Sequence, residues 1–205
     1  MERGIGTKGD GSAIGMGIDE IDRYLRGLSE TVDRVSREEI REVVDVLLAA
    51  CRARKRVYLV GNGGSATTAS HIANDLSKQA IVDGHPKFRA IALTDNMPLV
   101  TAWANDEDYS MVFYRQLDNH VEPGDVVIAI STSGQSRNVI RALELARERG
   151  AVTIGLTGSD GGAMCGLLDH CIFVPSADIG HQEAVHLALD HAITMAIRAR
   201  IADGL

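Results

Sequence analysis

Residues 58–77 read YLVGNGGSATTASHIANDLS, and the fold and the site are both inferred outward from this stretch. The apolar run of residues 57–60 ends in the turn Gly61-Asn62-Gly63-Gly64-Ser65, and a helical pattern follows the turn. A glycine turn between a strand and a helix leaves free backbone N–H groups at the positive end of the helix dipole, where an anion binds readily. His71 and Asp75 lie one turn apart on one face of that helix. The stretch therefore predicts an anion cradle and a titratable pair about two turns from each other.

Apolar segments and helical patterns alternate from residue 56 to the end of the chain. The predicted strands are 57–60, 90–93, 125–130, 151–156 and 171–174, and the predicted helices are 65–79, 97–105, 108–121, 136–149, 161–168 and 181–201. Continuous aliphatic strands that alternate with helices indicate a mostly parallel sheet with helices on both faces. We therefore expect an α/β three-layer sandwich around a mostly parallel five-stranded sheet, with ligands bound beyond the carboxyl ends of the strands.

The N-terminal part of the chain precedes this alternating pattern. Residues 1–16 are glycine-rich, and we expect a disordered tail there. Two helices are predicted between residues 17 and 54, and Ser36 with Glu39 forms the pattern of a capping box at the start of the second. These helices need another surface to cover, so a role in packing or in oligomer formation is expected. Residues 17–205 are expected to form a single domain with an N-terminal helical extension.

Length, charge and cysteine usage limit the class of protein. The chain has 205 residues, of which 45% are apolar, and this suffices for one α/β domain with a substantial core. Its net charge of −7 and the lack of a long basic stretch argue against a nucleic-acid partner. No apolar run approaches the ~18 residues of a membrane span, so no membrane partner is expected. Cys51, Cys165 and Cys171 are odd in number and lack CxxC spacing, which indicates reduced thiols and a cytoplasmic protein.

A second polar loop, Ser131-Thr132-Ser133-Gly134-Gln135-Ser136, follows the strand predicted at residues 125–130. Its hydroxyls surround a glycine at a strand–helix junction and can donate to a phosphate from several directions. Neither this loop nor residues 61–65 has the GxGxxG spacing or the lysine of a Walker loop. A neutral cradle of hydroxyls suits a sugar phosphate better than a nucleoside triphosphate. The glycine-rich residues 156–162 follow another strand and are interpreted as a structural turn.

The last predicted helix carries unusual polar residues on an otherwise apolar sequence, namely Glu183, His186, Asp190 and His191. Glu183 and His191 are two turns apart, roughly on one side. Taken singly, each of these residues is explained as a polar side chain of an amphipathic helix with its hydrogen bonds satisfied. Together with His71 and Asp75, however, this helix can bring two imidazoles and two carboxylates together as acid–base partners or as ligands of one divalent metal. A set of histidines and carboxylates suits Zn²⁺, and Mn²⁺, Ni²⁺ or Fe²⁺ fits as well.

These segments, in this order, resemble the sugar isomerase (SIS) domain, whose three-layer fold is of the flavodoxin-like nucleotide-binding type. STSGQS at residues 131–136 by itself indicates only an SIS domain. GNGGS at residues 61–65, the downstream His71 and the HxxxxH spacing of His186 and His191 narrow the resemblance to the phosphoheptose isomerase family, over about residues 17–200. Members of that family convert sedoheptulose 7-phosphate to D-glycero-D-manno-heptopyranose 7-phosphate. They are cytoplasmic homotetramers with active sites at subunit interfaces, and they often hold a zinc ion.

The resemblance also implies roles for individual residues. The phosphate-binding hydroxyls would be those of Ser65, Ser131, Thr132, Ser133 and Ser136. Asn62 and Asp106 would contact sugar hydroxyls, and Gly63 and Glu183 would be the remaining substrate-binding residues. The metal ligands would be His71, Asp75, Glu183 and His191, with Zn²⁺ as the expected ion. The catalytic residues would be Asp75 and His191.

Two positions depart from the family pattern. The family usually has Glu where this chain has Asp75, and Gln where a gapless match puts Glu183. A shift by one residue would match that Gln with Gln182, but it would place Asp190 on the catalytic histidine, so we prefer the gapless match. Aspartate is shorter than glutamate by about 1.5 Å of reach, and a base misplaced by that much costs ~100-fold unless the site compensates. Either the metal site has adapted or the substrate differs.

The expected reaction is an aldose–ketose isomerisation through a cis-enediolate, with Asp75 as the base and His191 as its acid–base partner. One alternative is an isomerase or epimerase of another phosphosugar, such as an octose or pentose phosphate. A second is a non-catalytic SIS phosphosugar-binding protein, as in the replication-initiator-associating group, which lacks the acid and the histidine present here. A third is a sugar-phosphate sensor fused to a DNA-binding segment, although the N-terminal helices here lack a basic recognition helix.

Overall fold

The structure is a computed structural model that describes residues 11–158 and 160–204. Five strands form one sheet in the order β2-β1-β3-β4-β5. They are β1 (Arg56–Gly61), β2 (Arg89–Ala92), β3 (Val126–Ser131), β4 (Val152–Thr157) and β5 (His170–Phe173). Every neighbouring pair runs parallel, so the predicted three-layer α/β fold is confirmed. The strand order reverses between β1 and β3, and flavodoxin-like sheets bind their ligands at such a switch point.

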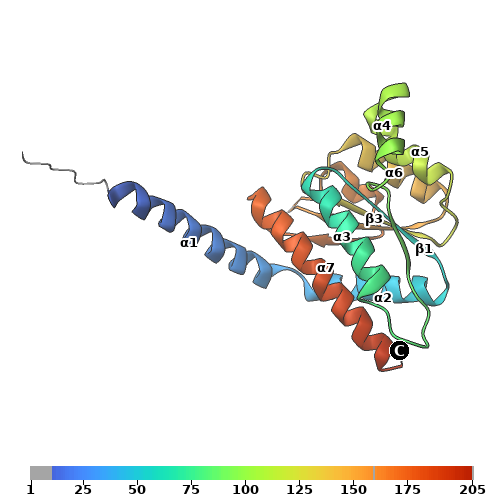
Figure 1. Cartoon of the computed structure of the whole chain (residues 1–205), viewed down its shortest axis with the longest axis horizontal. Helices are drawn as coiled ribbons and strands as arrows, with labels where there is room; N and C mark the ends of the chain where they lie inside the picture. Colours follow the sequence, from blue (N-terminus) through green and yellow to red (C-terminus); the bar gives the residue numbers. More distant parts are fainter. Residues whose placement is uncertain (1–10, 159, 205) are drawn as a thin grey trace, which may run out of the picture.

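Alternate residues of the strands build two apolar cores, one on each face of the sheet. Leu59 and Ile128 belong to the core beneath α2 (Arg37–Arg52), α3 (Gly64–Lys78) and α7 (Ile179–Ala202). Tyr58 and Val127 belong to the core beneath α5 (Val112–Asp118) and α6 (Arg137–Glu148). Figure 1 shows α3 and α7 running side by side on one side of the molecule, with α4 (Met97–Asp106), α5 and α6 on the other. The functional residues of α3 and α7 are therefore brought together by helix packing over one face.

Two predicted helices are shorter or tighter than expected. Residues predicted as one helix at 108–121 form a 3₁₀ turn, η1 (Tyr109–Met111), followed by α5. The helix predicted at 161–168 is also 3₁₀, η2 (Gly162–Leu167). Both are short connectors with little apolar periodicity, where the tighter i to i+3 turn is common.

The N-terminal helix α1 (Gly11–Arg34) projects from the body of the protein (Figure 1). It begins at Gly11, so residues 11–16, predicted as part of a disordered tail, are helical, whereas residues 1–10 of that tail lie outside the described residues. Adding one residue to an existing helix costs much less free energy than starting a helix. The helix predicted from the apolar pattern that begins at Ile18 can therefore extend toward the N-terminus as far as Gly11. The helix contacts α7 through His181, whose Nε2 lies 3.0 Å from the Tyr24 carbonyl oxygen.

The second helix, α2, starts at the predicted cap. The Ser36 hydroxyl accepts a hydrogen bond from the Glu39 N–H at 3.2 Å, which is half of a capping box. The Glu39 carboxylate does not return to Ser36 but accepts from the Phe173 N–H of β5 at 3.2 Å. This helix is therefore tied to the edge strand. Among the described helices, none has the length and apolar character needed to cross a membrane.

Candidate active site

Three polar loops lie next to one another at the carboxyl edge of the sheet. The register pairs Gly61 of β1 with Ile130 of β3, and Ser131 of β3 with Thr157 of β4. Because all strands are parallel, the segments that follow them leave the sheet at the same edge. The loop of residues 61–65, the loop of residues 131–136 and the turn after residue 157 therefore form one surface at the switch point.

The first loop brings α3 close to its strand. Gly63 has a φ of 53°, a left-handed conformation that favours glycine, and it is the N-cap of α3. Ser65, a residue type favoured at N-caps, instead lies within the first turn of the helix and is buried. The start of α3, with its free backbone N–H groups, thus lies at the switch point.

The second loop is shaped by its own hydroxyls. Ser131 Oγ accepts from the Gly134 N–H at 3.1 Å, and Ser133 Oγ accepts from the Gln135 N–H at 3.2 Å. A hydroxyl that accepts from the backbone keeps its own hydrogen for donation. Ser136 is the N-cap of α6 but its side chain does not bond the first turn of the helix. The Ser131 and Ser133 hydroxyls therefore retain a hydrogen to donate, and the Ser136 hydroxyl is not used as a cap.

The third loop supports the second. The Gly158 N–H donates to the Thr132 carbonyl at 3.1 Å, and the Met164 N–H donates to the Gly134 carbonyl at 3.0 Å. A Cβ on Gly134 would lie 2.1 Å from the Gly161 carbonyl oxygen, so the two loops touch backbone to backbone. These contacts agree with the structural turn predicted for residues 156–162.

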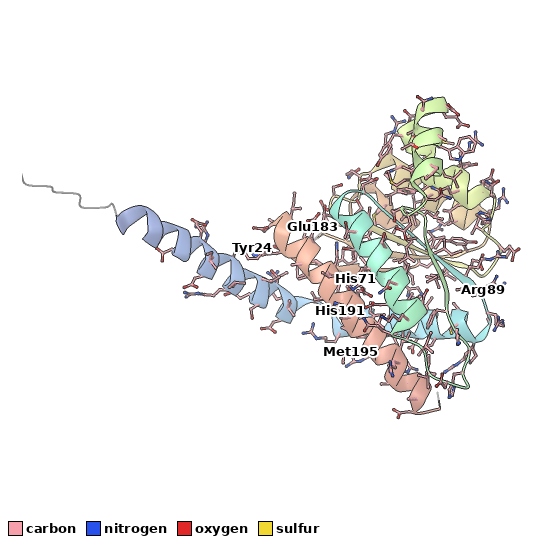
Figure 2. All side chains as sticks on the ribbon, viewed as in Figure 1. Tyr24, His71, Arg89, Glu183, His191 and Met195 are labelled. Carbon is pink, nitrogen blue, oxygen red and sulfur yellow. The ribbon has the colours of Figure 1, made fainter. Side chains whose placement is uncertain are left out.

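A cluster of titratable side chains lies further along α3, against α7. It contains His71 and Asp75 of α3 with Asp190 and His191 of α7, and each offers one atom such that all four lie within 4.8 Å of one another. Figure 2 shows His71 and His191 next to each other on the two adjacent helices. Their rings meet edge to face, with 5.0 Å between the ring centroids. We call these four residues the α3–α7 cluster.

Asp75 is fully buried but well supplied with partners. Its Oδ1 accepts from Asn74 Nδ2 and from Gln79 Nε2, both at 2.9 Å. Its Oδ2 lies 3.2 Å from His191 Nδ1 and 3.7 Å from His71 Nε2. Two amide donors thus orient the carboxylate so that one defined oxygen faces both histidines.

Asp190 is equally buried, but its carboxylate has few hydrogen-bond partners. Its Oδ1 accepts from Thr194 Oγ1 at 3.4 Å, whereas Oδ2 has no hydrogen-bond partner among the described residues and lies 3.9 Å from His71 Nε2. Burial, with the nearby negative charge of Asp75, raises the pKa of the Asp190 carboxyl to about 6. A buried carboxylate oxygen without a donor is costly unless a cation faces it.

The donor set fits a divalent metal. Two imidazoles and two carboxylates, one with a buried unpartnered oxygen, converge on one small volume between α3 and α7. Nitrogen and oxygen ligands of this kind suit Zn²⁺ and other first-row divalent ions. The residues of the α3–α7 cluster are therefore able to hold such an ion.

The structure does not bring Glu183, one of the predicted metal ligands, to this cluster. A Cβ on Gly64 would lie 2.6 Å from Glu183 Oε1, so the carboxylate rests against the first turn of α3. Figure 2 shows Glu183 near the start of α7, away from His191. Eight residues along a helix rise about 12 Å, which explains the separation. Asp190 occupies the position in the cluster that the sequence pattern assigned to Glu183.

The two residues predicted to contact sugar hydroxyls differ in their surroundings. Asn62 lies in the first loop, where its carboxamide bonds to Asn138 and Tyr109. Asp106 is the exposed last residue of α4, and its carboxylate accepts from Asn105 Nδ2 at 2.9 Å. No hydrogen bond among the described residues joins Asp106 to the loops or to the α3–α7 cluster.

Three residues near the site were not assigned a role from the sequence. Asp190 was visible as a carboxylate on an apolar helix beside His191, and that combination was its signal. Asn138, which is buried in the first turn of α6, and Tyr109 of η1 carried no local signal, because only the fold brings them to Asn62.

Comparison with known proteins identifies relatives of this chain. The SIS domain profile matches residues 22–158. The chain is 44% identical over 162 residues to the phosphoheptose isomerase of Mycobacterium tuberculosis, which covers 79% of this chain and 82% of that protein.

Solved structures give the same picture. The structure of phosphoheptose isomerase from Neisseria gonorrhoeae superposes with a TM-score of 0.82 at 29% identity, over 92% of this chain and 100% of that one. The structure of a phosphoheptose isomerase from Francisella tularensis superposes with a TM-score of 0.84 at 26% identity, over 89% of this chain and 98% of that one.

Proposed function

This chain belongs to the SIS domain family and, within it, to the phosphoheptose isomerases, and we propose from this premise how its residues work. It is an aldose–ketose isomerase that converts sedoheptulose 7-phosphate to D-glycero-D-manno-heptopyranose 7-phosphate through an enediolate. The observation that carries the assignment of residues is the spacing along α3. This one helix begins at the glycine–serine turn and carries His71 and Asp75 of the α3–α7 cluster.

That spacing suits a seven-carbon sugar phosphate. From Ser65 to His71 the helix rises about 9 Å. An extended seven-carbon chain has six carbon–carbon bonds of about 1.5 Å and spans roughly 7 to 8 Å. A phosphate held at the loops would therefore leave the first two carbons of the sugar at the α3–α7 cluster. A shorter sugar phosphate would bridge the two regions less well.

The loops bind the phosphate. Hydroxyls of Ser65, Ser131, Thr132, Ser133 and Ser136 donate to its oxygens, with the N-terminus of α3 supplying backbone N–H groups. Binding energy from this remote group orients the sugar and is used at the reacting carbons. Asn62, Gly63 and Glu183, which lie at the same end of α3, bind the substrate beside the phosphate. Asp106 lies on a different element, α4. It would contact the sugar only if the bound substrate extends as far as α4 or if another subunit packs against α4.

Asp75 is the base that moves the proton between the first two carbons. Its Oδ1 is occupied by two amide donors, so Oδ2 is the oxygen that takes the proton. His191, with Nδ1 at 3.2 Å from that oxygen, exchanges protons with the two sugar oxygens. The shorter aspartate in place of glutamate is compensated by burial and by a fixed orientation.

The α3–α7 cluster also holds a divalent metal, which we propose to be Zn²⁺. His71, Asp75, Asp190 and His191 would be its ligands, with Asp190 in place of Glu183. A carboxylate bound to the ion is a weaker base, so Asp75 would not hold the ion and take the proton in the same step. Such an ion would supply Lewis-acid polarisation of the substrate carbonyl and stabilise developing negative charge. The unpartnered Asp190 oxygen supports this assignment, because a cation there would remove the cost of burying it.

The protein acts as a homo-oligomer, with a tetramer as the expected form. α1 projects from the body, and Ile21 and Leu25 on it are more than half exposed, as is Met195 on α7. A second apolar surface is the groove between the end of α1, the start of α2 and α7, which Val35, Ile40 and Leu189 line. Covering these surfaces with other copies of the chain would bury them. The three free cysteines suit a cytoplasmic location, where thiols stay reduced.

The direct test is conversion of sedoheptulose 7-phosphate followed by NMR. The protein is assayed as purified, after chelation, and after Zn²⁺ is restored, with bound metal measured in each sample. An aldoheptose phosphate signal that disappears on chelation and returns with Zn²⁺ would support both the reaction and the metal. Turnover that survives complete chelation would leave Asp75 and His191 as a metal-free acid–base pair.

The two departures from the family pattern justify a second candidate substrate. Asp75 in place of Glu and Glu183 in place of Gln change the reach of the base and the charge near the sugar. A panel of pentose, hexose, heptose and octose phosphates distinguishes the candidates. A kcat/KM for sedoheptulose 7-phosphate well below that for another sugar phosphate would reassign the substrate while leaving the reaction class in place.

A further inference from the structure

The carboxamides of Asn62 and Asn138 form a reciprocal pair that joins the two phosphate loops. Asn62 Nδ2 donates to Asn138 Oδ1 at 2.9 Å, and Asn138 Nδ2 donates to Asn62 Oδ1 at 2.8 Å. Asn62 lies between β1 and α3, whereas Asn138 lies in the first turn of α6 and is only 2% exposed. Residues far apart in the sequence are therefore fixed to each other at the switch point of the sheet.

A backbone group determines which way both amides face. The Val139 N–H donates to Asn138 Oδ1 at 3.0 Å, and a backbone N–H requires an oxygen at that position. With Asn138 fixed, its Nδ2 must face the oxygen of Asn62, and Asn62 Nδ2 must face Asn138 Oδ1. The orientation of Asn62 is thus set by a residue of another helix.

Tyr109 completes the arrangement from a third element. Its hydroxyl donates to Asn62 Oδ1 at 2.9 Å, so this oxygen accepts from both Asn138 and Tyr109. A carbonyl oxygen has two lone pairs and is then fully used. One hydrogen of Asn62 Nδ2 is committed to Asn138, which leaves a single N–H. Asn62 can therefore only donate, and it can donate only once.

Asn62 lies beside a cavity, so its restriction to a single donated hydrogen bond determines what it can offer to a ligand there. With Gly61, Gly63 and Tyr109 it lines a cavity of about 300 Å³ beside the loop of residues 61–65. An asparagine free to rotate would offer this space either an oxygen or an amide nitrogen. The same side chain, fixed by three hydrogen bonds with two residues, offers one donor to one oxygen of a ligand.

We propose that Asn138 and Tyr109 are positioning residues that fix the Asn62 carboxamide so that its one free N–H donates to an oxygen of the sugar chain. This inference rests on the proposed function, because it takes the role of Asn62 as a substrate-binding residue. Neither positioning residue needs to touch the substrate. Their effect on turnover passes through Asn62.

The sharpest variant is Asn138→Asp, which keeps the shape of the side chain. The introduced carboxylate still accepts from the Val139 N–H, but it places an acceptor against Asn62 Oδ1. Either orientation of the Asn62 carboxamide then sets its oxygen against a carboxylate oxygen, so the pair opens and Asn62 no longer holds its N–H in one place. We expect a loss of kcat/KM of roughly 10- to 100-fold. At lower pH the carboxyl group gains a hydrogen that can donate to Asn62, so activity relative to wild type should recover as pH falls.

Tyr109→Phe is the milder variant, since it removes only the hydroxyl. It leaves the Asn62–Asn138 pair in place and should cost roughly 3- to 10-fold in kcat/KM. Thermal unfolding of both variants is measured in parallel, and melting temperatures close to that of wild type are expected. A loss of activity that follows the melting temperature and does not recover at low pH would indicate a structural role and overturn the proposal.

A double-mutant cycle with Asn62→Ala tests whether the effect passes through Asn62. If Asn138 acts through Asn62, then Asn138→Asp should cause no further loss in the Asn62→Ala background. Independent, additive losses in the two backgrounds would overturn the proposal.

An NMR measurement separates this proposal from the proposed function. The side-chain NH₂ signals of the six asparagines are recorded, and those of Asn62 are identified by their loss in Asn62→Ala. One Asn62 amide hydrogen should be protected from exchange in wild type, and its protection should be lost in Asn138→Asp. If both hydrogens exchange freely in wild type, the proposal fails whatever the activity. Protection in a protein that does not isomerise any sugar phosphate would instead refute the proposed function.

Discussion

The loops at the carboxyl edge of the sheet and the α3–α7 cluster are both polar, but they are stabilised in opposite ways. In the loops, hydroxyls and backbone groups bond to one another, as Ser131 does to the Gly134 N–H and Gly158 to the Thr132 carbonyl. In the cluster, the Asp190 carboxylate is buried between two helices with one oxygen lacking any partner among the described residues. The loop groups named here are therefore satisfied by their own hydrogen bonds, whereas the cluster leaves one buried carboxylate oxygen unsatisfied.

The difference suits the division of the proposed activity between the two regions. A preformed cradle of neutral donors binds a dianionic phosphate without reorganising. A cluster of buried charges has the unbalanced electrostatics that proton transfer and metal binding need. Changes in the loops should therefore act mainly on binding and loop stability, and changes in the cluster mainly on turnover and metal affinity. The following predictions test this division, from the largest expected effect to the smallest.

Asp75→Asn should give the largest effect. Asn has the same shape and its oxygen can still accept from Asn74 and Gln79, but it cannot take a proton from carbon. Loss of a general base is expected to lower kcat by about 10³-fold, or ~4 kcal/mol, with a small change in melting temperature. The exposed Asp45→Asn serves as the control and should be neutral. Turnover of Asp75→Asn above about a tenth of wild type would contradict the assigned role.

Gly134→Ala should damage the loops. Gly134 has a φ of 60°, and a Cβ there would lie 2.1 Å from the Gly161 carbonyl oxygen, so strain and a backbone clash add together. We expect about 3 kcal/mol of lost stability and a raised KM for the sugar phosphate. Gly84→Ala is the matched control, because Gly84 also has a positive φ of 83° but open space around its Cα. Equal destabilisation of the two variants in chemical denaturation would mean that the loop contact is unimportant.

Asp190→Asn should act in opposite directions with and without metal. In the metal-free protein it removes a buried, unpartnered charge and should raise the free energy of unfolding by about 2 to 3 kcal/mol. It should also reduce the stabilisation that Zn²⁺ provides. Thermal unfolding of chelated and Zn²⁺-loaded samples measures both. Destabilisation of the metal-free protein by this substitution would show that the oxygen has a partner after all.

His186 should make stability depend on pH with a modest amplitude. Burial lowers the pKa of His186 from 6.5 to about 4, while its Nε2 lies 3.4 Å from the Thr157 carbonyl oxygen. The unfolded chain therefore binds more protons than the folded one between these pKa values, and stability falls as pH falls through that window. Between pH 7 and pH 5 the loss attributable to this group is about 2 kcal/mol. Urea unfolding of wild type and His186→Gln should differ in pH slope, and identical slopes would exclude this origin.

Much of the fold and part of the site could be predicted because their signals are local. Glycine, serine and threonine between an apolar run and a helical pattern identify a strand-end loop, and the positions of both polar loops were predicted from that alone. The pairing of His71 with Asp75 follows from helical spacing. The role of Glu183 as a metal ligand was not reproduced, because its position was inferred from a pattern along α7 that does not fix which side chain reaches which neighbour.

The sequence by itself determined the alternating α/β order, the parallel sheet and the two polar loops, since each follows from periodicity and from the conformational preferences of glycine and serine. Only the tertiary structure decided which carboxylate of α7 meets His71 and Asp75, and which side chain orients Asn62. The angle and offset at which α3 packs on α7 select Asp190 over Glu183. The adjacency of β1 and β3 brings Asn138 to Asn62 across 76 residues. Both depend on packing between residues that are far apart in the sequence, and no short stretch of the chain carries a signal for such packing.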